Sequence, residues 1–97
     1  MRLMAKSTTI TRRLLLIDDD EDLREIFYAT LSAIANLEVL VAESGKAGLA
    51  IANREPLDAI LLDLVMPEMD GVEVFHQLQS NPATQGIPVI FMTARTH

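Results

Sequence analysis

The stretch from Leu57 to Gly71 constrains the fold of this chain more than any other part of the sequence. It contains a short apolar run, Ala59-Ile60-Leu61-Leu62, which ends on the carboxylate of Asp63. Apolar runs of this length are typical of a strand that is covered on both faces, as in a parallel sheet. Pro67 and Asp70-Gly71 then indicate a loop and the start of a new element. Because open α/β sheets bind ligands outside the carboxyl ends of their strands, Asp63 stands where such a sheet presents a reactive group.

Two other apolar runs also end on residues that carry chemistry. Leu14-Leu15-Leu16-Ile17 leads into five consecutive acids, Asp18 to Asp22, and Pro88–Met92 leads into Thr93-Ala94. A lone aspartate after a strand is ordinarily a turn residue, so Asp63 alone would indicate little. With the first and third strands adjacent in a parallel sheet, however, all of these strand ends lie along one edge. The sequence therefore predicts a site at that edge.

The segments between these runs have the patterns of helices and of one further strand. Residues 23–34 are apolar at helical spacing on one face, and Asp20 or Asp22 can cap that helix. Leu37–Ala42 is expected to be a strand near an edge, because Glu38 interrupts it. The expected second and third helices are Ser44 to about Asn53, weakened by Gly45 and Gly48, and Gly71 to about Ser80, with Val72, Phe75 and Leu78 inward and His76 outward. Strands that alternate with helices predict parallel βαβ units.

Composition narrows the classes of function. The chain has 97 residues, a net charge of −6 and no cysteine, so it predicts one small domain without disulfides or thiolate metal sites. The acidic balance argues against direct binding of nucleic acid. No apolar run approaches the roughly 18 residues that a membrane span requires, and the start of the chain lacks the apolar core of a signal peptide. We expect a leader over residues 1–12, a domain over 13–97, and a cytoplasmic location.

The carboxylates at the predicted edge favour a divalent cation. Several carboxylates close together repel one another, unless one takes up a proton or a cation lies between them. Mg²⁺ prefers sites with a few carboxylates and waters that leave room for a phosphoryl oxygen. A carboxylate beside such a cation can act as a nucleophile and form an aspartyl phosphate. A hydroxyl at a neighbouring strand end, such as that of Thr93, could hydrogen-bond to the transferred group.

Three blocks of this sequence resemble the receiver domain of two-component response regulators. They are Leu14–Glu25, Leu61–Gly71 and Ile87–Ala94, and their order and spacing are those of that family. The resemblance covers the chain from about Arg13 onward. It implies an α/β, flavodoxin-like (CheY-like) doubly wound parallel sheet in the order 2-1-3-4(-5), in three α/β/α layers. It also implies a phosphoacceptor of a phosphorelay rather than an enzyme, at most with self-phosphorylation and autodephosphorylation.

The resemblance further implies a role for each residue of the site. Asp63 would accept a phosphoryl group from a phosphohistidine of a sensor histidine kinase or phosphotransfer protein, and Asp63 would also contact Mg²⁺. Asp19 would ligate Mg²⁺ directly, Asp18 through water, and Val65 through its backbone carbonyl, with Mn²⁺ as a usable substitute. Thr93 would bind the phosphoryl group, and Ala94 would leave space for it. The expected partners are the kinase and a downstream protein or fused effector domain, with neither nucleic acid nor membrane bound by this segment.

The chain departs from the family pattern after Ala94. The family has a Lys-Pro pair after a fifth strand, followed by a fifth helix, and the 97 residues do not include them. We therefore interpret the chain as a receiver cut short, for which the alternative function is a truncated or degenerate module that acts only through protein interactions. Without a fifth strand, Pro88–Met92 would be an uncharged edge, so we expect the 97-residue chain to be either marginally folded or self-associated through the fourth strand.

Two phosphate-binding classes are disfavoured by single positions. A haloacid-dehalogenase-type phosphohydrolase needs a second Asp two residues after the first, where this chain has Val65. A flavodoxin binds its phosphate with a Ser/Thr/Gly-rich loop after the first strand, where this chain has acids.

Overall fold

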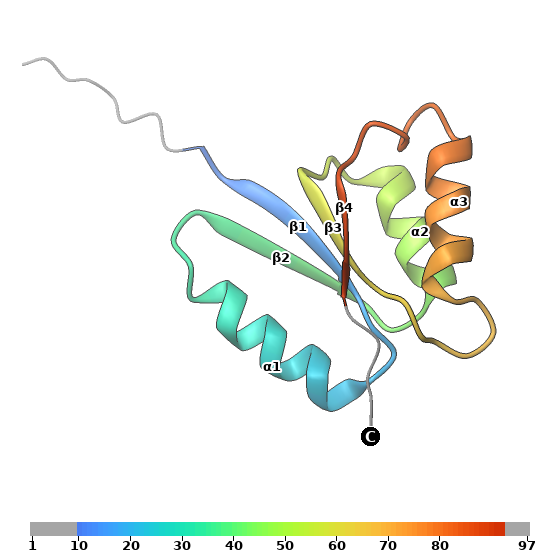
Figure 1. Ribbon diagram of the computed structural model, residues 1–97. Coiled ribbons are helices and arrows are strands. Elements are labelled where there is room, and N and C mark those ends of the chain that lie inside the picture. The colour runs from blue at the N-terminus through green and yellow to red at the C-terminus, as the bar shows by residue number, and fades with distance from the viewer. Residues whose placement is uncertain (1–9, 93–97) are drawn as a thin grey trace, which may run out of the picture.

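The computed structural model describes residues 10–92, in which strands and helices alternate along the chain (Figure 1). Their bounds are β1 Arg12–Ile17, α1 Glu21–Ser32, β2 Leu37–Ala42, α2 Gly45–Arg54, β3 Ala59–Asp63, α3 Gly71–Ser80 and β4 Val89–Met92. All neighbouring strands pair in parallel, in the order β2-β1-β3-β4. This confirms the predicted doubly wound sheet in its first four strands, with β2 at an edge as Glu38 had indicated. Thr93 and Ala94 lie outside the described residues.

The sheet is covered by helices on both faces, which gives the predicted three layers. Figure 1 shows α2 and α3 together on one side of the sheet and α1 on the other. Alternate residues of the two central strands, Leu15 and Ile17 of β1 and Ile60 and Leu62 of β3, are fully buried on the side of α2 and α3. The larger apolar core therefore lies between the sheet and this helix pair. On the other side, α1 packs against β1 and β2 and buries none of its own residues completely.

Each helix begins directly after a strand-end loop and has a side-chain cap. For α1, the side chain of Asp20 accepts the N–H of Leu23 at 3.1 Å. For α2, Ser44 accepts the N–H of Ala47 at 3.1 Å, and for α3, Asp70 accepts the N–H of Glu73 at 3.0 Å. These are the caps that the sequence predicts, with Asp20 rather than Asp22 for the first helix. Each cap satisfies a free backbone N–H at the start of its helix and fixes the point at which the loop from the preceding strand enters that helix.

The predicted inward face of the third helix is wrong at one position. α3 buries Gly71, Val74 and Leu78, whereas Val72 is 49% exposed. Successive residues of a helix are rotated by about 100°, so once Gly71 faces the core, Val72 must turn away from it. Phe75 is half-buried at the margin, where its ring meets Phe91 of β4 edge-on at a centroid distance of 5.4 Å.

The amino end of β1 is fixed by polar contacts. The strand begins at Arg12, one residue before the predicted start of the domain, and Arg12 donates its N–H to the carbonyl of Asn36 (3.0 Å). The guanidinium of Arg13 bonds to the carboxylates of Glu38 (3.1 Å) and Glu55 (3.0 Å). Both carboxylates raise the pKa of Arg13, Glu38 more than Glu55. Arg13 thus connects β1 to β2 and to the segment before β3. These contacts lie at the end of the sheet opposite Asp18, Asp19 and Asp63.

None of the helices formed by residues 10–92 combines the length and the apolar character that crossing a membrane would require.

Candidate functional site

The two central strands bring three carboxylates together at their carboxyl ends. In the parallel register of β1 and β3, Ile17 lies beside Leu62, so the residues that follow, Asp18 and Asp63, come level with each other. One carboxylate oxygen from each of Asp18, Asp19 and Asp63 lies within 4.8 Å of the other two. Asp18 and Asp63 are buried, with 1% and 3% of their surface exposed, and Asp19 is half-buried. The juxtaposition that the sequence predicts for these three residues is therefore present.

Backbone hydrogen bonds set the orientation of the two buried carboxylates. The carboxylate of Asp18 accepts the N–H of Asp20 at 3.0 Å, and that of Asp63 accepts the N–H of Val65 at 3.1 Å. In both loops an aspartate thus bonds to the backbone two residues further along, which is the pattern of an Asx turn. The N–H of Asp18 continues the ladder between β1 and β2 by donating to the carbonyl of Ala42 (3.1 Å). Each loop therefore holds its own carboxylate in place.

Gly71 lets the start of α3 lie directly on the backbone of Asp63. Its N–H donates to the carbonyl of Leu64 at 3.0 Å. A Cβ atom at this position would collide with the carbonyl oxygen of Asp63 and would come within 2.8 Å of the Cα atom of Leu64. Any side chain here would have to displace the strand end that carries Asp63, so this position requires glycine for its close approach.

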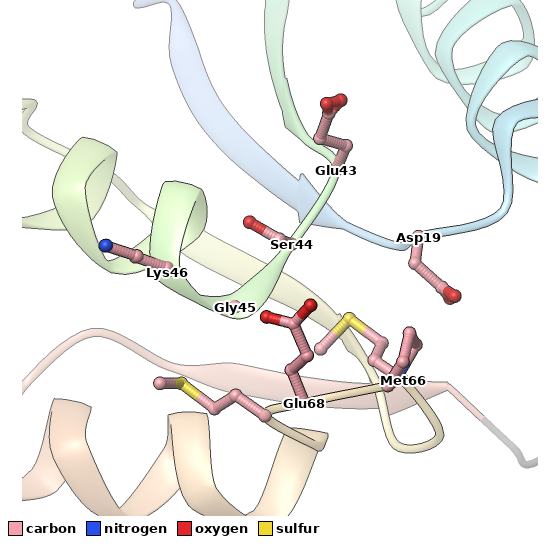
Figure 2. A pocket seen from close by; sticks show the side chains of 9 residues that line it. Asp19, Glu43, Ser44, Gly45, Lys46, Met66 and Glu68 are labelled. Carbon is pink, nitrogen blue, oxygen red and sulfur yellow. The ribbon is translucent and has the colours of Figure 1, made fainter.

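A hollow of about 430 Å³ opens beside the three carboxylates (Figure 2). It lies between the loop after β2 and the loop after β3, and Asp19 reaches it from the loop after β1. Figure 2 shows Met66 and Glu68 of the β3–α3 loop facing Asp19 and the start of α2 across this space. Its lining is Asp19, Glu43, Ser44, Gly45, Lys46, Met66, Pro67, Glu68 and Met69. Thus an open space, lined by three acids, one lysine and uncharged residues, reaches the carboxylate cluster at Asp19.

Two residues near the site have features that no sequence pattern above singles out. Arg24 of α1 donates a hydrogen bond from Nη1 to the backbone carbonyl of Asp18 at 2.9 Å. Glu68 has a left-handed backbone, with φ of 67°. The only signal in the sequence for Arg24 is a cation near the amino end of a helix, where the helix dipole disfavours positive charge.

The sequence and the fold were compared with those of known proteins. The family model described as the response regulator receiver domain matches residues 14–97. The chain belongs to this family. It is 40% identical over 84 residues to a probable cyclic di-GMP phosphodiesterase of Vibrio cholerae, and the match covers 87% of this chain but 19% of that protein. The receiver family is therefore established, and the chain spans about a fifth of the length of this relative.

Two solved structures share the fold. One is the chemotaxis protein CheY4 of Vibrio cholerae, with a TM-score of 0.81 and 29% identity over 90% of this chain and 72% of that one. The other is the receiver domain of the sensor histidine kinase PA1611 of Pseudomonas aeruginosa, with a TM-score of 0.81 and 25% identity over 88% of this chain and 69% of that one. The second structure has a magnesium ion coordinated in its active site cleft. These similarities confirm the CheY-like fold.

Proposed function

We propose that this receiver domain accepts a phosphoryl group on the carboxylate of Asp63. The observation that carries the proposal is the convergence of Asp63 with Asp18 and Asp19 beside an open hollow. In the reaction, a carboxylate oxygen of Asp63 attacks the phosphorus of a phosphohistidine. The new P–O bond forms as the P–N bond breaks, and the imidazole leaves with the electron pair of that bond.

The position of Asp63 in the sheet favours it as the acceptor. It ends β3, which pairs with β1 on one side and with β4 on the other, so the strand that carries it is held from both sides. Gly71 and the Asx turn to Val65 fix the backbone and the carboxylate of Asp63 further. A carboxylate that is already oriented loses little freedom when it reacts, which lowers the cost of reaching the transition state.

The same carboxylates suit a hard divalent cation. Asp19 would hold Mg²⁺ directly, Asp18 through water, and Asp63 and the carbonyl of Val65 would complete the protein ligands, with Mn²⁺ as a substitute. Three carboxylates within 4.8 Å of one another repel unless positive charge is present among them, which supports this assignment. When bound, the cation would neutralise charge on the transferred phosphoryl group. Thr93 and Ala94 would complete the site by hydrogen-bonding to the phosphoryl group and by leaving space for it.

The receiver family supports a set of partners for this site. We propose that the phosphoryl donor is a sensor histidine kinase or a phosphotransfer protein, and that phosphorylation changes binding to a downstream protein or effector domain. The reaction would take place in the cytoplasm, and the segment itself would act as a phosphoacceptor rather than as an enzyme.

Phosphorylation with acetyl phosphate and Mg²⁺ tests this proposal. The intact mass of the chain should increase by one phosphoryl group, and Asp63→Asn should abolish the increase because the amide cannot act as the acceptor. Asp22→Asn is the matched control, since Asp22 lies exposed in the first turn of α1, outside the carboxylate cluster. A phosphoryl group that Asp63→Asn retains would assign the acceptor to another residue.

A further inference from the structure

We infer that Arg24 is a positioning residue for the cation site, which orders the loop that carries Asp18 and Asp19. This inference rests on the proposed function. Arg24 lies on α1, one turn after the cap Asp20, and its side chain folds back over the loop. Its Nη1 donates to the carbonyl oxygen of Asp18 at 2.9 Å, a hydrogen bond that is charge-assisted because the donor is a guanidinium. The bond is partly buried, so water competes with it less than at an exposed site.

The contacts of the loop show what this bond adds. The N–H of Asp18 is held by Ala42, and its carboxylate is held by the N–H of Asp20. Asp20 in turn caps α1 and accepts the N–H of Arg24 through its backbone carbonyl (2.9 Å). The guanidinium thus acts on the Asp18 carbonyl, which belongs to the peptide that leads into Asp19. Arg24 therefore holds the peptide group from which the backbone of Asp19 continues.

The stability of α1 does not explain why an arginine stands at position 24. A cation in the amino-terminal part of a helix opposes the helix dipole, so this charge does not stabilise α1. Among residues 10–92, Arg12, Arg13 and Arg54 form ion pairs with carboxylates, whereas Arg24 forms none. The Arg24 guanidinium instead donates to the carbonyl of Asp18, in the loop between β1 and α1. The position of Arg24 is therefore better explained by its hydrogen bond to the β1–α1 loop than by any contribution to the stability of α1.

The charge of Arg24 and a positioning role for Arg24 predict opposite changes in Mg²⁺ affinity when its side chain is removed. A positive side chain near a cation site repels the cation, so its removal should strengthen Mg²⁺ binding. If the side chain orders the ligands, its removal should weaken binding in spite of the lost repulsion. Partners that orient metal ligands without touching the metal typically contribute about tenfold or more to affinity. The sign of the change therefore separates the two roles.

The decisive experiment compares Arg24→Gln with Lys46→Gln in the 97-residue chain. Mg²⁺ affinity is measured from the backbone amide shifts of Asp19 and Asp63, with Mn²⁺ as a second probe. We expect Arg24→Gln to weaken Mg²⁺ binding about tenfold, and Arg24→Lys, which keeps a donor and the charge, to recover part of the loss. Lys46 lines the same hollow as Asp19, so Lys46→Gln removes a nearby charge from the first turn of α2 and should leave the affinity unchanged or higher. Unchanged or stronger binding in Arg24→Gln would overturn the inference.

Hydrogen exchange in the metal-free chain provides a readout that does not depend on the proposed function. Arg24→Gln should reduce the protection of the Asp20 and Leu23 amides, which the loop holds, while amides in the centre of β1 and β3 keep theirs. Equal protection of the loop amides in parent and variant would contradict an ordering role for Arg24. A parent chain that does not respond to Mg²⁺ would instead contradict the proposed function, and the exchange comparison would still decide whether Arg24 orders the loop.

Discussion

At the scale of single residues, the loop after β3 contains a local strain. Glu68 has φ of 67°, and the N–H of Met69 donates to the carbonyl of Pro67 at 2.7 Å, which forms a γ-turn centred on Glu68. Residues with a Cβ atom lose about 1–2 kcal/mol in the left-handed region, and glycine does not. Glu68 lines the hollow beside Asp19, so the strained residue belongs to the site itself.

We predict that Glu68→Gly stabilises the chain. Relief of the left-handed strain should exceed the extra backbone entropy that glycine brings to the unfolded state, which leaves a net gain of about 0.5 kcal/mol. Urea denaturation measures the free energy of unfolding. Glu68→Ala is the control, because alanine keeps the Cβ atom and should leave the stability close to that of the parent. A Glu68→Gly variant less stable than Glu68→Ala would show that the turn is not strained by its side chain.

Some residues of the site could be predicted from the sequence, and others could not. Asp18, Asp19 and Asp63 could be predicted because they directly follow apolar strands, and the parallel register then places strand ends side by side. Arg24 and the conformation of Glu68 could not, because a hydrogen bond to a loop carbonyl and a left-handed turn depend on how the loops close. No pattern of residue types specifies either of them.

At the scale of elements, α2 illustrates how packing overrides propensity. Its glycines make it a weak helix by sequence, yet it forms over Gly45–Arg54. A Cβ atom on Gly48 would collide with Cδ1 of the buried Ile17 in β1 and would lie 2.7 Å from its Cγ1. Gly48 therefore permits α2 to approach the sheet closely, and the burial gained there offsets the poor propensity. Periodicity alone misplaced the inward face of α3, since the predicted positions Val72 and Phe75 each lie one residue after the buried Gly71 and Val74.

We predict that Gly48→Ala destabilises the chain by about 1–2 kcal/mol, although alanine is the better helix former. Overpacking of a well-filled core typically costs about 1–3 kcal/mol, which exceeds the gain of about 1 kcal/mol in helix propensity. Ile17→Val removes Cδ1, so the double variant should lose less stability than the sum of the single variants. Thermal and urea denaturation of all four proteins measure this. Strict additivity would show that Ile17 is not the group that Gly48 accommodates.

At the scale of the whole molecule, β4 is the outer strand of the sheet that residues 10–92 form. Within these residues it pairs with β3 on one side and with no strand on the other. Residues 88–92 carry no charge, and Ile90 is 55% exposed. Uncharged edges of this kind promote pairing with another chain, and natural proteins often protect them with lysine. The net charge of −6 opposes association of two copies in general, but this edge has no charged side chain of its own to prevent strand pairing.

We therefore predict that the 97-residue chain self-associates by pairing β4 edges, and that Ile90→Lys reduces this association. A lysine on the edge would have to be buried beside its counterpart in the partner, whereas the β4 side chains that pack on the α2–α3 side, Val89 and Phe91, remain unchanged. Sedimentation velocity over a range of concentrations measures the mass. Ile26→Lys is the matched control, because Ile26 is an apolar residue of α1 that is 59% exposed and lies away from the edge. If Ile26→Lys dissociates the chain as well as Ile90→Lys does, the contact lies on the α1 face of the sheet. A parent that stays monomeric at every concentration would show that an uncharged edge of four residues is too short to pair.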